Sequence, residues 1–231
     1  MLRVLDITKK FGELVALDGV SFEVGKGECL GIIGPNGAGK TTLFSIISGF
    51  LKPDNGNIKF GNVNIVGKKP SYLAKIGLVR TFQIIKVFKN MSVEENLLVA
   101  NSNNPDFEKE ILKLVDLWDK RDMIASNLSQ GELRRLSIGM ALATQPKVLL
   151  LDEPFSGLSV KEAKNLSSII KELENEGITQ IIIEHKLKEL FGVSERILVL
   201  NFGKIIFEGS AKDAVKDEKV IQAYFGKHAK N

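Results

Sequence analysis

One short segment constrains this chain more than any other: Gly34-Pro35-Asn36-Gly37-Ala38-Gly39-Lys40-Thr41 satisfies the pattern G-x-x-x-x-G-K-[ST]. It follows the apolar run Cys29 to Ile33, and the apolar spacing after it predicts a helix over Thr41 to Ile47. Strand, loop and helix in this order form the setting in which the pattern cradles phosphate groups. Glycines permit positive φ, so successive backbone N–H groups converge on phosphate oxygens, and the helix N-terminus adds partial positive charge. The segment therefore predicts a phosphate-binding loop rather than an ordinary Gly-rich turn.

The predicted loop assigns separate roles to its polar side chains. Lys40 is expected to neutralise the β- and γ-phosphates of a nucleotide, and Thr41 is expected to ligate Mg²⁺. We expect nucleotide contacts along the whole loop and the start of the helix, from Gly34, Pro35, Asn36, Gly37, Ala38, Gly39, Lys40, Thr41 and Thr42.

A second candidate site lies where the apolar strand predicted over Val148 to Leu151 ends in Asp152 and Glu153. In α/β sheets, ligands collect beyond the carboxyl ends of the strands. We expect Asp152 to hold Mg²⁺ through its water shell, and Glu153 to polarise a water in line with the γ-phosphate as a general base. Acids at strand ends often only solvate a turn, but the phosphate loop elsewhere in the chain favours the catalytic interpretation.

The remaining pattern predicts an α/β fold with two additions. Short β-like runs in the opening third, such as 14–17 and 20–24, predict an antiparallel sheet. Residues from about 84 to 127 are predicted to be mostly helical, with helix starts at Ser92 and after Pro105. Helices over 132–144 and 161–176 then alternate with strands over 148–151 and 179–183, which predicts a mostly parallel sheet.

Composition limits the class of protein. The 231 residues are 44% hydrophobic, which suits one domain with an insertion or two small ones. The 32 Lys and Arg nearly balance the 28 Asp and Glu, so a nucleic-acid partner is not expected from charge alone. The single cysteine, Cys29, fits a reducing compartment. No segment approaches the ~20 apolar residues of a membrane helix, so a cytoplasmic location is expected.

A third motif places the chain beside a known family. Leu128-Ser129-Gln130-Gly131-Glu132 precedes a long predicted helix, and by itself it indicates only a helix start with a capping box. Its position matters: it follows the phosphate loop and Gln83, and it precedes the Asp152-Glu153 pair and His185. This order of motifs resembles the ABC ATPase family over essentially the whole chain.

The resemblance implies a role for each matching residue. Gln83 corresponds to the Q-loop glutamine, a catalytic residue and Mg²⁺ ligand, Glu153 to the catalytic glutamate, and His185 to the switch histidine. Phe11 matches the aromatic residue that stacks on adenine, whereas Ser129, Gln130 and Gly131 correspond to the nucleotide-contacting signature, and Ser156-Gly157-Leu158-Ser159 to the D-loop. Taken singly, His185 or Phe11 is more often a structural residue, and Gln83 alone indicates nothing.

The same resemblance implies an architecture and partners. A single ATPase domain over 1–231 is expected, with a RecA-like P-loop core and β subdomain at 1–83 and 132–231 and a helical subdomain at 84–131. ATP and Mg²⁺ are the implied cofactors. The implied partners are integral-membrane permease subunits and a second ATPase subunit, which would place the chain on the inner face of the cell membrane.

The transported solute rests on finer resemblance. Residues 80–96, the pair Glu184-His185 and residues 220–226 resemble the ATPases of branched-chain amino-acid importers. Related ATPases serve urea or amide uptake and lipopolysaccharide export, and both stay open as alternatives. A soluble ABC ATPase acting on nucleic acid or ribosomes usually has two cassettes or a long coiled-coil insertion, which this sequence lacks. A P-loop GTPase or small-molecule kinase would share the loop but not the segment 128–132.

Overall fold

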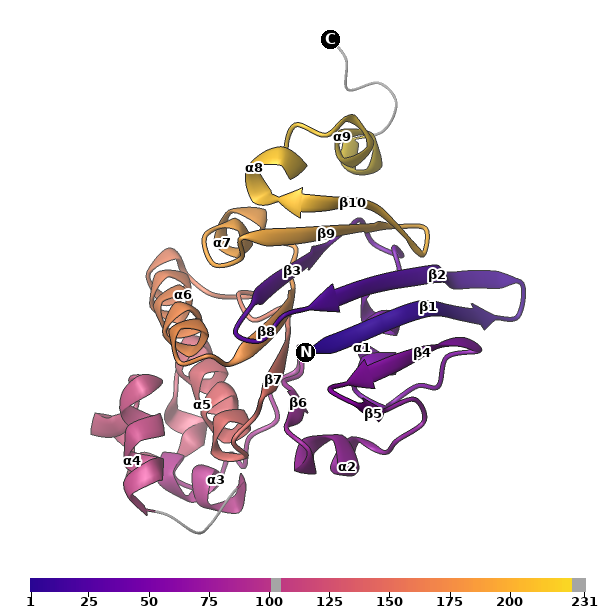
Figure 1. Ribbon diagram of the computed structural model, residues 1–231. Coiled ribbons are helices and arrows are strands. Elements are labelled where there is room, and N and C mark those ends of the chain that lie inside the picture. The colour runs from indigo at the N-terminus through magenta and orange to yellow at the C-terminus, as the bar shows by residue number, and fades with distance from the viewer. Residues whose placement is uncertain (101–104, 226–231) are drawn as a thin grey trace.

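The computed structural model describes residues 1–100 and 105–225. Gly226, the last residue of the C-terminal resemblance, and residues 101–104 of the predicted helical subdomain lie outside the described residues. Figure 1 shows a central sheet with the N-terminal strands on one side and the helices α3 to α6 on the other.

The central sheet contains the strand that leads into the phosphate loop. Its order is β10-β9-β3-β8-β7-β6, and all neighbours are parallel except β10 and β9. The strands are β3 (Cys29–Ile33), β6 (Leu78–Arg80), β7 (Val148–Asp152), β8 (Thr179–Ile183), β9 (Arg196–Asn201) and β10 (Lys204–Ser210). Every residue of β3, β7 and β8 is buried, as apolar strands covered on both faces require. The predicted mostly parallel sheet is confirmed.

The N-terminal strands form a second, four-stranded sheet of order β2-β1-β4-β5. It comprises β1 (Leu2–Phe11), β2 (Leu14–Val24), β4 (Asn55–Phe60) and β5 (Val63–Asn64). All pairs are antiparallel, which confirms the predicted arrangement. The two short runs expected at 14–17 and 20–24 are one strand, because Gly19 at φ 70° is accommodated where the β1–β2 register shifts.

Nine α-helices occur in the described residues. They are α1 (Lys40–Ile47), α2 (Pro70–Lys75), α3 (Val93–Ala100), α4 (Pro105–Leu114), α5 (Gln130–Ala143), α6 (Val160–Asn175), α7 (Leu187–Phe191), α8 (Ala211–Ala214) and α9 (Glu218–Phe225), with 3₁₀ turns η1 (Trp118–Lys120) and η2 (Ala125–Asn127).

The side chains of β7 alternate between two hydrophobic cores. Leu149 and Leu151 lie in the core that includes α3 to α6, and Val148 and Leu150 lie in the core beneath the N-terminal sheet. No helix in this described part is long and apolar enough to cross a membrane.

The segment 84–92 is not helical, and the first helix after it begins at Val93, in agreement with the helix start predicted at Ser92. A fully buried Asn96 holds this segment instead: its side chain accepts from Phe88 N at 2.7 Å and donates to Phe88 O at 3.0 Å and Ser92 O at 2.8 Å. The predicted capping box at Ser92 and Glu95 is present, and it starts α3 at Val93.

Replacing Asn96 by Ala removes the acceptor of Phe88 N, whereas Phe88 O keeps the hydrogen bond from Met91 N. We expect the free energy of unfolding to fall by about 1 to 3 kcal/mol, since an unsatisfied buried donor costs roughly that much. Urea denaturation followed by circular dichroism measures this. The exposed Asn90 is the matched control, and Asn90→Ala should stay within about 0.5 kcal/mol of the unchanged chain. Equal stability of both variants would contradict the assigned role of Asn96.

Candidate functional site

The phosphate loop is wedged between the two sheets. A Cβ at Gly34 (φ 154°) would lie 2.2 Å from Leu200 O, and one at Gly39 (φ 103°) would lie 2.5 Å from Ala16 O. These two glycines therefore let the loop pack against β9 and β2. Gly37 differs, because nothing lies within 4 Å of the Cβ position and only its φ of 79° requires glycine. The packing fixes the loop at the start of α1.

Lys40 is a buried cation inside this loop. It is 6% exposed, and its Nζ donates to Gly34 O at 2.6 Å and Pro35 O at 3.0 Å. Burial lowers the pKa of the Lys40 ammonium, and the charge of Glu153 opposes that shift. An ammonium held by carbonyl dipoles in a desolvated loop is a good partner for concentrated negative charge.

A hollow of about 490 Å³ opens above the loop, a size typical of small-molecule sites. It brings together several predicted site residues that lie far apart in the sequence. The lining includes half-exposed Phe11, loop and helix residues Asn36 to Thr42, Glu153 and His185, together with Phe202, which the sequence did not single out.

Glu153 is held by the two other predicted catalytic residues. Gln83 Nε2 donates to one carboxylate oxygen at 2.7 Å, and His185 Nε2 lies 3.2 Å from the other. The backbone of Glu153 has a φ of 48°, an unfavourable conformation for this residue type that is found mainly at functional sites. Three residues separated by up to about a hundred positions therefore meet beside the loop.

Asp152 is the last residue of β7 and is buried. Its Oδ2 accepts from Arg80 Nη2 at 2.7 Å, and the other terminal nitrogen of Arg80 donates to Ser48 Oγ at 3.1 Å. The guanidinium also lies within 5.3 to 5.9 Å of the ring centres of three phenylalanines, Phe44, Phe50 and Phe82. Arg80 thus ties Asp152 to α1, a contact that the sequence did not reveal.

Glu184 organises the loops that carry Glu153 and His185. It is 1% exposed, and its carboxylate accepts from Phe155 N at 2.8 Å and His185 N at 2.6 Å. Burial raises the pKa of Glu184, whereas these backbone N–H groups oppose the shift. A carboxylate directly after the apolar run Ile181 to Ile183 is the sequence signal that points to this residue.

The residues of the predicted signature lie elsewhere. Ser129 caps α5 in a capping box with Glu132, as predicted, and α5 starts at Gln130. Within the described ranges, the hollow above the loop is lined by none of Ser129, Gln130 and Gly131. The single chain therefore does not bring the signature to its own phosphate loop.

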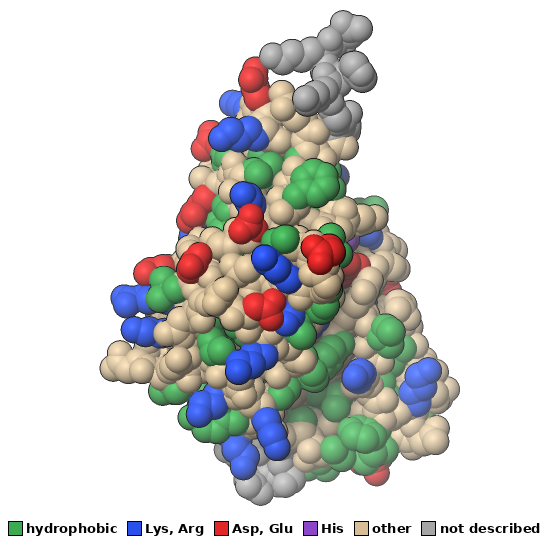
Figure 2. Space-filling model, turned by 90° about the vertical axis from the view of Figure 1, so that its right-hand side faces the viewer, with side chains coloured by type: hydrophobic (Ala, Val, Ile, Leu, Met, Phe, Trp, Pro, Cys, Tyr) green, Lys and Arg blue, Asp and Glu red, His purple; other side chains and the backbone are tan. Residues whose placement is uncertain are grey.

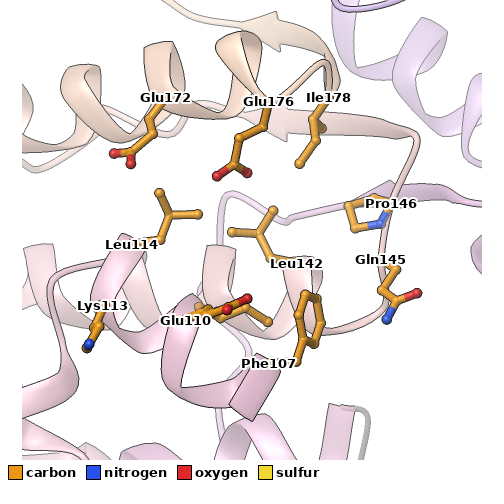
Figure 3. A pocket seen from close by; sticks show the side chains of 11 residues that line it. Phe107, Glu110, Lys113, Leu114, Leu142, Gln145, Pro146, Glu172, Glu176 and Ile178 are labelled. Atoms are coloured by element: carbon orange, nitrogen blue, oxygen red, sulfur yellow. The ribbon is translucent and has the colours of Figure 1, made fainter. Parts of the chain in front are cut away.

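A larger hollow, of about 600 Å³, is not the candidate site. It lies between α4 and α6 (Figure 3), where Glu172 and Glu176 face Glu110 and Leu114. Burial raises the pKa of Glu176, and the charges of Glu172 and Glu110 add to the shift. Clustered carboxylates repel phosphate groups, so this hollow lacks the chemistry that the smaller one provides.

A phosphate loop between β3 and α1, beside an acidic strand end of a parallel sheet, defines a P-loop nucleotide hydrolase. The ABC transporter family matches residues 17–156. The chain belongs to this family and is one of its nucleotide-binding ATPases, which confirms the predicted family, fold class and activity.

Individual relatives are similar along the full chain. The probable branched-chain amino acid transport ATP-binding protein LivG of Methanocaldococcus jannaschii is 40% identical over 253 residues, covering 98% of this chain and 97% of that protein. The ADP conformation of an ATP-binding cassette of an ABC transporter has a TM-score of 0.89 and 37% identity, covering 98% and 99%. A dimeric cassette in a post-hydrolysis state, bound to ADP and Pi, has a TM-score of 0.78 and 26% identity, covering 91% and 99%.

Lys40→Ala should weaken ATP binding roughly 100-fold or more, because the phosphates lose a desolvated cation and its charge-assisted hydrogen bonds. Isothermal titration calorimetry with Mg·ATP measures the affinity. The exposed Lys52 provides the control: Lys52→Ala should bind ATP normally. Unchanged affinity in Lys40→Ala would show that the loop does not hold the phosphates.

Proposed function

We propose that this chain hydrolyses ATP to drive a permease that imports branched-chain amino acids. The name and 40% identity of the Methanocaldococcus relative support the solute class, as does the resemblance of residues 80–96. ATPases for urea or amide uptake and for lipopolysaccharide export remain the alternatives. The chain is then a peripheral subunit on the cytoplasmic face of the membrane, bound there through the permease.

The arrangement of Glu153 supports the catalytic step most directly. Its carboxylate, held by Gln83 and His185 within the hollow that Lys40 lines, polarises the water that attacks the γ-phosphate. Lys40 and the backbone of the loop bind the phosphates, Phe11 stacks on adenine, and His185 orients Glu153. Gln83 binds Glu153 through Nε2, and the amide oxygen of the same side chain is the atom that would be offered to a metal.

The residues fit a Mg²⁺ ion bound together with nucleotide. Residues 1–100 and 105–225 contain no group of three His, Cys, Asp or Glu side chains placed to hold a metal by themselves. Mg²⁺ commonly takes one or two carboxylates plus waters and substrate phosphates, and Thr41, Gln83 and Asp152 suit that mode. When bound, the ion neutralises charge on the β- and γ-phosphates.

A second ATPase subunit completes the site. The N-terminus of α5, with Ser129, Gln130 and Gly131, has a partial positive charge that attracts a γ-phosphate, but it lies outside the hollow of its own chain. A head-to-tail partner brings this end onto the phosphates held by the loop. The dimeric cassette bound to ADP and Pi supports this arrangement.

The remaining features fit a transport subunit. The division into a core at 1–83 and 132–231 and a helical subdomain at 84–131 agrees with the position of α3 and α4 outside α5 (Figure 1). Charges of both signs are interspersed with hydrophobic side chains on the face shown in Figure 2, which does not favour a nucleic-acid interface there.

Glu153→Gln should bind ATP but hydrolyse it at least ~100-fold more slowly, because the amide cannot accept the proton of the attacking water. The trapped species should be a dimer in Mg·ATP and a monomer in Mg·ADP. Light scattering of the variant in each nucleotide measures this, alone and mixed with any partner ATPase. A monomer under every condition, or a dimer indifferent to nucleotide, would contradict the composite site.

The surface beside Gln83 is the expected permease contact. Ile84 is 78% exposed and Phe88 48% exposed, whereas Val87 packs against the core. Ile84→Asp and Phe88→Asp should therefore lower ATP-driven transport in proteoliposomes while the basal ATPase rate stays within about twofold, because an exposed substitution perturbs folding little. Val87→Asp serves as the folding control and should lower both. Loss of both activities in all three variants would argue against a docking surface.

A further inference from the structure

Two side chains stand out on the surface of this chain. Among the large hydrophobic residues that the structure describes, Val160 (85%) and Phe202 (83%) are the most exposed. They belong to different elements, since Val160 begins α6 and Phe202 lies in the turn between β9 and β10. Single exposed apolar side chains are common on protein surfaces, so the position of each one relative to the site decides whether it has a role.

Phe202 is fixed beside the phosphate loop. Its φ is 44°, a rare conformation for a bulky residue. The next residue holds the turn in place: Gly203 N donates to Ala38 O of the loop at 3.1 Å, and Gly203 O accepts from Asp18 N of β2 at 2.9 Å. Figure 1 shows this turn beside β2. The turn and the loop therefore form one rigid edge.

Phe202 also stands between two hollows. One is the hollow above the loop, and the other is a smaller one formed with Pro35, Asn36 and residues Gln222 and Ala223 of α9. A partner that approaches the open end of the phosphate loop must therefore meet Phe202.

Val160 belongs to the same surface as the signature. Glu162, two residues on in α6, accepts from Ser159 N at 2.9 Å and from Ser129 Oγ at 3.4 Å. A Cβ at Gly131 would lie 2.4 Å from its Oε1, so a side chain at this position would displace the Glu162 carboxylate from the signature. Through Glu162, the end of the D-loop and the N-terminus of α5 form one face with Val160 exposed on it.

We propose that Phe202 of one copy packs against Val160 of a second copy when ATP joins the two chains. The proposal rests on the head-to-tail dimer proposed above, which brings the edge bearing Phe202 opposite the face bearing Val160. Contact removes both apolar side chains from water. By symmetry the pair occurs twice, once beside each nucleotide, so the apolar contact adds to the ATP-dependent interface.

Cysteine cross-linking tests the contact. Two variants are prepared in the Glu153→Gln background, one with Phe202→Cys and the other with Val160→Cys. They are mixed and treated with a short bismaleimide. The natural Cys29 is 1% exposed, and burial raises the pKa of its thiol to about 12, so it should not react. We expect the mixture to form a cross-linked dimer in Mg·ATP. The yield of this dimer should be several-fold lower in Mg·ADP, and lower when either variant is treated alone.

Light scattering on the same samples separates the two proposals. An ATP-dependent dimer without a cross-link in the mixture overturns the Phe202–Val160 contact and leaves the composite site intact. Absence of any dimer overturns the pairing of two copies of this chain, and with it the Phe202–Val160 contact, whereas the composite site is tested with a partner ATPase as described above. A mixture of Phe202→Cys with Val63→Cys is the control. Val63 lies in β5 and is 41% exposed, so the yield of cross-linked dimer in this mixture measures random collision.

A mutant cycle tests whether the contact contributes to dimerisation. In the Glu153→Gln background, Phe202→Ser and Val160→Ser should each weaken the ATP-bound dimer by about tenfold, and the double variant should be little weaker than either. Val63→Ser should leave the dimer unchanged. A tenfold loss of Mg·ADP affinity in Phe202→Ser would place Phe202 against the nucleotide base and overturn the proposal.

Discussion

The register of three parallel strands determines where every part of this site lies. Ile183 of β8 pairs with Ile32 of β3 and with Asp152 of β7, so the three strands end at the same level. The phosphate loop, the Glu153 turn and the Glu184-His185 turn consequently leave the sheet side by side. A shift of one residue in β7 would replace the buried Asp152 by a neighbour that faces the other side of the sheet. Glu153 would move with the strand, and its hydrogen bond with Gln83 would be lost.

The site is also connected to the helix that bears the signature. Arg134 of α5 is 4% exposed and donates to Phe82 O at 3.1 Å and Gln83 O at 3.0 Å. Burial lowers the pKa of this guanidinium, and the carboxylates of Glu184, Glu153 and Asp152 oppose the shift. Because the backbone of Gln83 is bonded to α5 and its side chain to Glu153, a displacement of α5 relative to the sheet acts on the catalytic carboxylate.

Local patterns in the sequence were sufficient for the elements whose determinants are close together. The phosphate loop, the capping boxes at Ser92 and Ser129 and the apolar strands depend on residues within a few positions of one another. Pairings between distant positions left no such pattern. Arg80 meets Asp152 across 72 positions, and Ser129 meets Glu162 across 33. The bonds by which buried Asn96 holds Phe88 and the non-helical segment 84–92 likewise left no local pattern. Phe202 was missed because its importance comes from exposure, which only the fold reveals.

The departure of the signature from Leu-Ser-Gly-Gly-Gln has a structural explanation at Glu132. A carboxylate in the first turn of α5 would repel an approaching phosphate if it faced outward. Instead, one of its oxygens accepts from Ser129 N at 2.8 Å and the other pairs with Lys120 of η1. Burial alone would raise the pKa of Glu132, but the bonds to Lys120 and Ser129 outweigh it and lower the pKa. The charge of Glu132 is therefore used within the chain as a helix cap and ion pair, and it is not directed at an approaching phosphate.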